Sequence, residues 1–220
     1  MKIHNHGEIE LVDVLGDDWT PVRAARVSYG SDALKGVEDD TKLLRYLIKN
    51  RHTSPFEQVA TVWKVKAPIF VFREWHRHRT AKLNEMSGRY TEFEREFYIP
   101  NAWRQPSKKN KQSSVLTAKP EEWQDINFAG YEMTCNQAFD AYESLLKRGV
   151  AKEQARMVLP VSTYSQMIWQ SDLHNLWHFL NLRTHPRAQL EIREYATAMV
   201  SILRSKLPIL MGIWEELRDK

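Results

Sequence analysis

Pro68 divides two neighbouring segments whose side-chain periods differ, and this change of period limits what the chain can fold into. Residues 58–67 alternate, which predicts a β-strand with one face formed by Val59, Thr61, Trp63 and Val65. Residues 69–79 place their apolar side chains on one helical stripe. Proline fits the first turn of a helix, because its missing N–H would have no partner there. The fold must therefore combine sheet and helix.

The other segments follow the same two patterns. We expect a strand at residues 9–14, a strand or irregular extended piece at 90–99, and an exposed loop at 100–120, which is rich in Ser, Lys, Asn, Gln and Pro. Helices are expected at residues 19–27, 40–50, 121–148, 151–159, 188–206 and 208–217, and around His174 and His178. We predict an α+β fold, an antiparallel sheet flanked by helices, in a single domain spanning residues 1–220.

Composition narrows the class of protein. Hydrophobic residues make up 42% and charged residues 27% of the chain, as in folded soluble proteins. No apolar run is long enough to span a bilayer, and the N-terminal segment lacks the apolar core of a secretory signal. We therefore expect a cytoplasmic protein. The single cysteine, Cys135, excludes an internal disulfide, and its helical context predicts a buried, inert thiol.

Residues 73–90, REWHRHRTAKLNEMSGRY, concentrate polar chemistry. Arginine binds phosphate or carboxylate oxygens two at a time, so several arginines close together indicate a multiply charged anion. Asn84, Glu85 and Ser87 supply donors and acceptors for the edge of a heterocycle, and Gly88 allows close approach of backbone to a ligand. A basic helix with a solvated outer face explains the arginines equally well. The polar run 84–90 favours a nucleotide-binding loop.

Ser54 has a structural interpretation here and a second, functional one that depends on a resemblance described below. Ser54, Pro55 and Glu57 are arranged as a capping box, which predicts the start of a short helix at this point.

The run RHRTAKLNEMSGRY, residues 77–90, resembles the signature of the flavin-dependent thymidylate synthases, RHRxxSxNExSxR. Lys82 stands where the pattern has Ser, and the other positions match at Arg77, His78, Arg79, Asn84, Glu85, Ser87 and Arg89. The resemblance continues in HTSPFE at 52–57, ARMVLP at 155–160 and LNLR at 180–183. It departs at His185 and Arg187, in a segment where the family has Asp-x-His-Ala-Gln.

The resemblance implies a reaction and its cofactors. The family converts dUMP to dTMP, with methylenetetrahydrofolate as carbon donor, reduced FAD as hydride donor and NADPH to reduce the flavin again. It does so without an enzyme cysteine nucleophile, in a homotetramer whose active sites lie between subunits.

The resemblance also implies roles for single residues. Arg183 would be catalytic, because it would face the uracil and stabilise the anion formed when N3 loses its proton. The residues implied to bind dUMP are Glu74, Arg77, Glu85, Met86, Ser87, Gly88, Arg89, Arg156 and Arg183, with Arg156 on the phosphate. Glu74 stands where relatives frequently have Gln. The residues implied to bind FAD are Ser54, Arg77, His78, Arg79, Glu85, Asp172, His174 and His178.

Two hypotheses from other classes remain open from the residues alone. A metal-dependent hydrolase of nucleotides or nucleic acid could use His76, His78, His174, His178 and His185, of which His174 and His178 share a helix face. A nucleic-acid-binding module is the other, but the lysines of residues 100–120 lack aromatic partners on which bases could stack. A metal site is not the favoured interpretation, because the Glu of the zincin pattern is missing beside His174.

Overall fold

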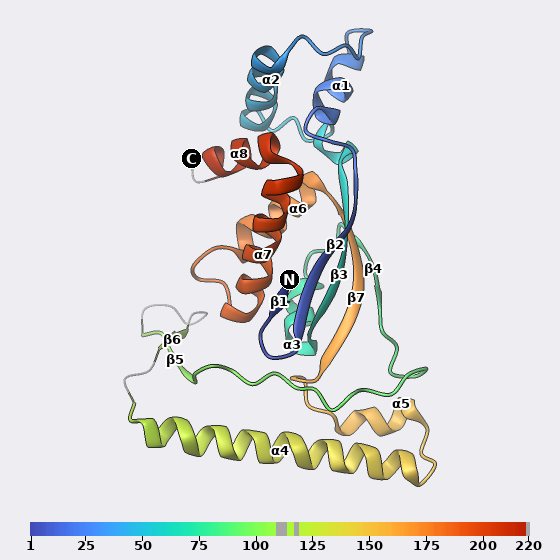
Figure 1. Ribbon diagram of the computed structural model, residues 1–220, viewed down its shortest axis with the longest axis vertical. Coiled ribbons are helices and arrows are strands. Elements are labelled where there is room, and N and C mark those ends of the chain that lie inside the picture. The colour runs from blue at the N-terminus through green and yellow to red at the C-terminus, as the bar shows by residue number, and fades with distance from the viewer. Residues whose placement is uncertain (109–113, 117–118, 219–220) are drawn as a thin grey trace.

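A five-stranded antiparallel sheet forms the centre of the computed structural model, which describes residues 1–108, 114–116 and 119–218 (Figure 1). Its strand order is β1-β2-β3-β7-β4. The strands are β1 (Lys2–Ile3), β2 (Gly7–Leu15), β3 (Ala60–Pro68), β4 (Lys82–Glu85) and β7 (Tyr164–Asp172). The α+β prediction, an antiparallel sheet with flanking helices, is therefore confirmed.

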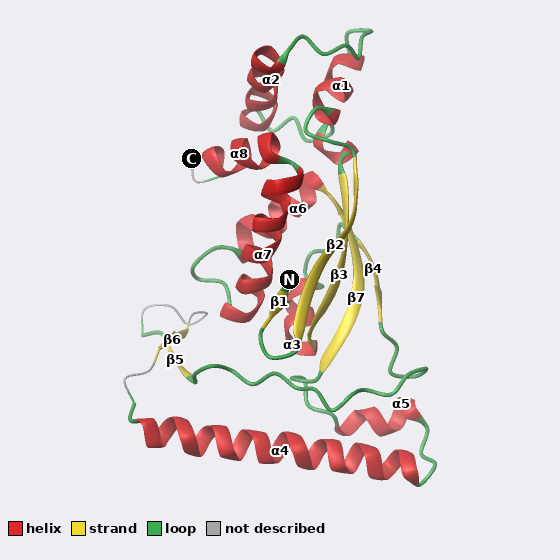
Figure 2. Cartoon of the chain, viewed as in Figure 1, coloured by secondary structure: helices red, strands yellow, loops and turns green. Residues whose placement is uncertain are grey.

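The helices cover one side of this sheet and both of its ends (Figures 1 and 2). The helices α6 (Leu173–Arg183), α7 (Leu190–Lys206) and α8 (Pro208–Leu217) run beside the sheet. At one end lie α1 (Thr20–Val27) and α2 (Val37–Lys49), and across the other end lie α4 (Glu121–Lys147) and α5 (Lys152–Ala155). Two single turns of 3-10 helix, η1 (Phe56–Gln58) and η2 (Arg156–Val158), precede β3 and β7. No helix among the described residues is long and apolar enough to cross a membrane.

The main core lies between the sheet and the helices α3 (Ile69–Trp75), α6 and α7. Trp63 of β3 and Trp169 of β7 are register partners and fully buried. The Trp75 ring of α3 packs against the Phe179 ring of α6 at a centroid distance of 4.8 Å and against Trp169 at 5.7 Å. Aromatic side chains bury much apolar area, so this cluster fixes α3 and α6 against each other.

A second, smaller core lies under α4. It contains Phe97, Phe139 and Tyr142, and also Cys135, whose predicted burial is confirmed. The segment 90–99 forms no regular strand; it is bonded to the chain around the start of β7 by an isolated bridge from Phe97 to Thr163 and by the Tyr164 amide, which donates to the Glu96 carbonyl at 3.0 Å, so the irregular alternative was right.

Four expectations about local structure need correction. The helix that begins at Ile69 ends at Trp75 rather than at Arg79, because the chain turns back there to bring β4 alongside β7. Asn84 and Glu85, the first two residues of the expected loop 84–90, belong instead to the edge strand Lys82–Glu85, which is largely exposed. Ser54 makes no capping hydrogen bond, and the expected helix is only the turn η1. The predicted helix 151–159 is two short pieces, α5 and η2.

The described part of the expected exposed loop at 100–120 contains two short strands. Arg104–Pro106 (β5) pairs with Ser114–Leu116 (β6) in a small hairpin. Residues 109–113 and 117–118 of this expected loop lie outside the described residues. The strand β7 carries no expectation from the sequence at all, although it pairs with both β3 and β4.

Candidate active site

Arg183, the last residue of α6, is held by three hydrogen bonds from different guanidinium nitrogens. Its Nη1 donates to Glu74 Oε2 at 2.8 Å, its Nη2 to the Glu74 carbonyl oxygen at 3.2 Å and its Nε to His78 Nε2 at 3.1 Å. Glu74 lies in the last turn of α3, and His78 follows just after that helix ends. The packing of Trp75 on Phe179 brings these two helix ends together. We call Arg183, Glu74 and His78 the arginine clamp.

His78 is neutral in this clamp. Its Nε2 accepts a hydrogen bond from Arg183, so that nitrogen carries no proton. Burial, and then the neighbouring charges of Arg183 and His178, lower the pKa of His78 to about 4. A positive charge on His78 would also face the Arg183 guanidinium, so the neutral form is the only one compatible with the clamp at neutral pH.

Among the described residues, Glu74 is the only acidic side chain that lines the cavity beside the clamp. This Glu74 cavity has a volume of about 810 Å³ and is also lined by Arg104, Arg183, Arg187 and Arg193. Burial raises the pKa of the Glu74 carboxyl; the charge of Arg183 opposes this, and the charge of Glu191 adds to it. Glu74 Oε1 makes no hydrogen bond among the described residues, whereas Oε2 accepts from Arg183. The cavity thus presents one acceptor and several cations to a ligand.

The opposite side of the clamp opens on a smaller, basic cavity. This Arg79 cavity, about 250 Å³, is lined by Arg77, His78, Arg79, His178 and Arg183, with Trp169 and Asn175. The guanidinium groups of Arg77 and Arg79 have no partner among the described residues, so both are available to an anion.

A third, more apolar cavity adjoins the Arg79 cavity at His178. This tryptophan cavity, about 530 Å³, is lined by Trp177 and Trp214 and by Arg51, His52, Thr53 and His174. The indole Nε1 atoms of Trp169, Trp177 and Trp214 are buried without a hydrogen-bond partner in the described chain. The two cavities together offer an apolar wall for flat rings and a cationic wall for phosphates.

A fourth cavity gathers residues of the signature run. This Ser87 cavity, about 470 Å³, is lined by Glu85, Met86, Ser87 and Arg156, with Arg73 and His76. Ser165 Oγ of β7 donates to Glu85 Oε1 at 2.8 Å, and the Met86 amide donates to the Gln166 carbonyl at 2.8 Å. The edge strand β4 therefore positions these side chains by pairing with β7.

Gly88 and Arg89 follow Ser87 in the chain but are not in the lining of the Ser87 cavity. A Cβ at Gly88 would lie 2.4 Å from the Phe93 ring and 3.0 Å from Arg156 Cδ, so only glycine fits between them. Arg89 Nε donates to Glu153 Oε2 at 3.1 Å, and Arg156 Nε donates to the Glu153 carbonyl at 3.4 Å. The two arginines thus converge on one segment, α5.

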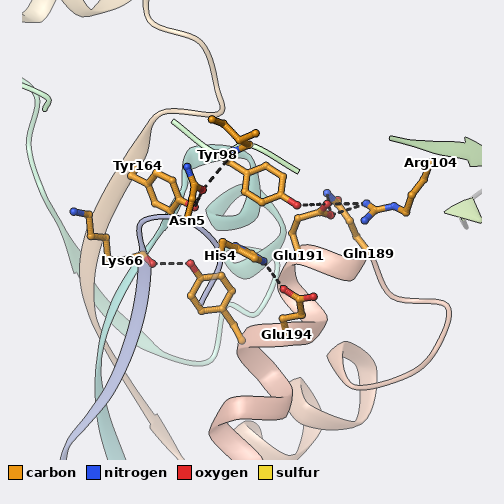
Figure 3. Close-up of polar contacts among 11 residues, drawn as sticks. His4, Asn5, Lys66, Tyr98, Arg104, Tyr164, Gln189, Glu191 and Glu194 are labelled. Atoms are coloured by element: carbon orange, nitrogen blue, oxygen red, sulfur yellow. Dashed lines mark hydrogen bonds and ion pairs between the residues drawn. The ribbon is translucent and has the colours of Figure 1, made fainter. Parts of the chain in front are cut away.

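A buried polar network supports the Glu74 cavity from behind (Figure 3). Arg104 of β5 binds both carboxylate oxygens of Glu191 at 2.7 and 2.9 Å. Glu191, at the start of α7, also accepts from Tyr98 and Gln189 and is 3% exposed. Next to it, His4 lies 2.8 Å from Glu194. Sequence reasoning missed Arg104 and Glu191, although a Glu on the apolar stripe of the helix 188–206 was a usable signal.

The expected site residues therefore lie in several places on one chain. The clamp joins Glu74, His78 and Arg183, whereas Glu85–Ser87 and Arg156 line a separate cavity. Ser54 lines none of the four cavities described above, and Thr53 beside it lines the tryptophan cavity. Asp172 is engaged as the N-cap of α6, where its side chain accepts from the Asn175 amide at 2.9 Å.

The five histidines of the hydrolase hypothesis do not gather in one place, although the ring centroids of His78 and His178 lie 5.8 Å apart. His76 lies by Glu85, His78 in the clamp, His174 and His178 at the tryptophan cavity, and the ring of His185 accepts from the Arg187 amide. In the part of the chain that the structure describes, no three His, Cys, Asp or Glu residues are grouped as a metal site. The described residues therefore do not bring these histidines together in the group that a metal-dependent hydrolase needs.

Comparison with known proteins identifies the family. Residues 10–209 match the family described as thymidylate synthase complementing protein, Thy1. A flavin-dependent thymidylate synthase of Thermus thermophilus is 49% identical over 98% of this chain and 78% of its own length. That of Treponema denticola is 44% identical over 97% of this chain and 81% of its own length.

The fold comparison agrees. A crystal structure of the UMP/dUMP methylase PolB from Streptomyces cacaoi, bound with 5-Br dUMP, superimposes with a TM-score of 0.88 at 34% identity. The match covers 98% of this chain and 97% of that one. Full-length similarity at these identities shows a shared family rather than a shared fold alone. The chain therefore belongs to the thymidylate synthase complementing protein family, which includes the flavin-dependent thymidylate synthases.

Proposed function

We propose that this protein catalyses the reductive methylation of dUMP to dTMP as a flavin-dependent thymidylate synthase. The observation that carries the proposal is the arginine clamp, in which the guanidinium of Arg183 is fixed at the wall of the Glu74 cavity. The carbon donor is 5,10-methylenetetrahydrofolate, and NADPH is the reductant for the flavin. Cys135 takes no part, because its thiol is buried under α4.

Arg183 activates the pyrimidine electrostatically. Two of its nitrogens, Nη1 and Nη2, each retain a second N–H that the clamp does not use. Donated to the uracil edge, these hydrogen bonds stabilise negative charge that develops when N3 is deprotonated. That charge spreads to C5, the carbon that must act as a nucleophile. His78 keeps the guanidinium oriented by accepting from Nε.

The cavities fit FAD as the cofactor. FAD combines flat ring systems with a pyrophosphate, and the joined tryptophan and Arg79 cavities combine apolar walls with unpaired arginines. Arg77, His78, Arg79, His174 and His178 are the residues that would hold it. We assign Ser54, Glu85 and Asp172 to FAD on the family resemblance, and on one chain these three line neither cavity. Bound FAD supplies, once reduced, the hydride that the reaction needs.

The nucleotide site is shared between subunits of a homotetramer. The residues that we assign to dUMP divide into two groups: Glu74, Arg77 and Arg183 form one, and Glu85–Arg89 with Arg156 form the other. On one chain, Glu74 and Arg183 line the Glu74 cavity, whereas Glu85, Met86, Ser87 and Arg156 line the separate Ser87 cavity. Association that sets the Ser87 cavity of one subunit against the clamp of another completes the site, with Arg156 on the phosphate and Arg183 on the base.

The test is optical and chemical. Purified protein with added FAD should show the flavin absorption bands, lose them with NADPH, and form dTMP on addition of dUMP and methylenetetrahydrofolate. Arg183→Ala should lower kcat by about two to three orders of magnitude, the loss typical of removing one preorganised donor. Arg193→Ala, which changes another arginine of the same cavity, controls for loss of charge. A protein that neither binds FAD nor forms dTMP would refute the proposal.

A further inference from the structure

Glu74 has a position that the activation of the pyrimidine by Arg183 does not yet explain. Its carboxylate is bound through Oε2 to the guanidinium that faces the substrate, while Oε1 has no hydrogen-bond partner in the described part of the chain and belongs to a side chain that lines the Glu74 cavity. One acceptor, Glu74 Oε1, and two unused N–H donors, on Arg183 Nη1 and Nη2, thus belong to side chains that are hydrogen-bonded to each other. The edge of uracil offers the complement, with an N3–H donor between two carbonyl acceptors.

We propose that the Glu74 carboxylate accepts the N3 proton of the bound pyrimidine, which makes Glu74 a further catalytic residue of the reaction. The N–H bond at N3 breaks and an O–H bond forms at Glu74 Oε1. The electron pair stays on the ring as the anion that Arg183 stabilises. No oxidant, reductant or further reactant is needed for this step. The inference rests on the proposed function, because it concerns the same uracil.

The other groups around Arg183 are poorly suited to this task. His78 already uses Nε2 to accept from Arg183, and burial beside that cation makes its ring a weak base. Glu191, whose charge also acts on Glu74, accepts from Arg104, Tyr98 and Gln189 (Figure 3) and is not in the lining of the Glu74 cavity. Glu74 is the acid that faces the cavity, and its other titratable and charged neighbours there are Arg104, Arg187 and Arg193.

Burial shifts the pKa of the Glu74 carboxyl in the direction that favours a general base. Partial removal from water raises the pKa of its carboxyl above the ordinary value, although Arg183 opposes the shift. A carboxylate with a raised pKa is a stronger base, and general bases work best when their pKa approaches the working pH. Arg183 at 2.8 Å keeps the ionised form populated before the substrate arrives.

The experiment compares Glu74→Gln with Glu74→Ala and with Glu10→Gln, an exposed charge-matched control on β2. Glutamine keeps the size of the side chain and can bond to N3–H, but it cannot take a proton. We expect Glu74→Gln to change the Kd for dUMP by less than about tenfold and to lower kcat on the order of a hundredfold, within the range for loss of a general base. Its activity should recover partly at alkaline pH, where free uracil loses the N3 proton. Glu10→Gln should behave as the unchanged protein.

A second measurement does not depend on turnover. The carbonyl carbons of dUMP labelled with 13C at C2 and C4 move downfield when N3 is deprotonated, so 13C NMR of the complex reports the protonation state directly. We expect downfield signals with the native protein and ordinary signals with Glu74→Gln.

The outcomes that would contradict the proposal are distinct. If the native complex shows ordinary signals at every pH, or Glu74→Gln keeps native kcat, pH profile and signals, Glu74 is not the base. If the native protein forms no dTMP at all, the proposed function itself has failed. Should Glu74→Gln not fold, the NMR pH titration of the native complex decides alone.

Discussion

At the scale of the residue, Gly88 has no room for a side chain. The sequence suggested that this glycine lets backbone approach a ligand, whereas the structure places it against the Phe93 ring and Arg156. We expect Gly88→Ala to destabilise the fold by about 1–3 kcal/mol, the usual cost of overpacking. Urea unfolding measures this.

Gly130 provides the matched control. It lies inside α4, and nothing is within 4 Å of the Cβ that alanine would add. Gly130→Ala should stabilise the protein by about 0.5–1 kcal/mol, because glycine is costly in a helix interior. Equal effects of the two substitutions would contradict the packing argument at Gly88.

His78 gives the fold a dependence on pH. Its pKa is lowered from 6.5 to about 4, so between these values the unfolded chain binds the proton that the folded chain does not. Stability should therefore fall as pH drops from 6.5 toward 4, level off below, and be unaffected by His78 above 6.5. His78→Gln removes the titrating ring but keeps an acceptor for Arg183. The difference between the two unfolding free energies, followed by urea titration, should change with pH in this window and nowhere else.

At the scale of the element, the start of α6 depends on Asp172. Its side chain accepts from the Asn175 amide and from Asn175 Nδ2, so Asp172→Ala should cost about 1 kcal/mol in stability, as for other lost N-caps. Asp172→Asn keeps an acceptor at the cap and should cost much less. If Asp172 also contacts FAD through its charge, both variants should weaken FAD binding, and titration of FAD separates this from the effect on stability.

The sequence predicted most helices because each carries a continuous apolar stripe. The sequence did not predict β7, because its buried face includes polar side chains and its exposed face includes an apolar one. The inner face contains the buried Ser165 and Ser171, and the outer face contains Ile168, which is 42% exposed. Alternation of apolar and polar residues is therefore blurred, and the strand that pairs with both β3 and β4 left no clear pattern.

The candidate site was predictable as a list of residues but not as an arrangement. Several arginines in one short run indicated an anion, and resemblance added Arg156 and Arg183. The pairing of Arg183 with Glu74 could not be read from the chain, because 109 positions separate the two residues. Arg104 and Glu191 form a buried pair for the same reason, through packing that no local period encodes.

At the scale of the whole molecule, a shared site predicts that defective subunits can complement each other. Arg156→Ala and Arg183→Ala change different cavities, so each variant alone should be inactive. Unfolded together and refolded, they should regain dTMP formation, because some sites combine two native halves. A mixture of Arg156→Ala with Arg89→Ala, whose side chains both bond to Glu153, should stay inactive. Equal activity in the two mixtures would show that the site lies within one chain.

The pairing of β3 with β7 also has a consequence for the order in which the protein forms. The ladder from Ala60 with Asp172 to Pro68 with Tyr164 joins segments about a hundred residues apart, and contacts between distant segments slow folding because a long loop must close first. During synthesis, the antiparallel pair of β2 and β3 exposes one edge of β3 until β7 has left the ribosome. The complete sheet, and with it the candidate site, can therefore form only after β7 and the helices that follow it have been synthesised.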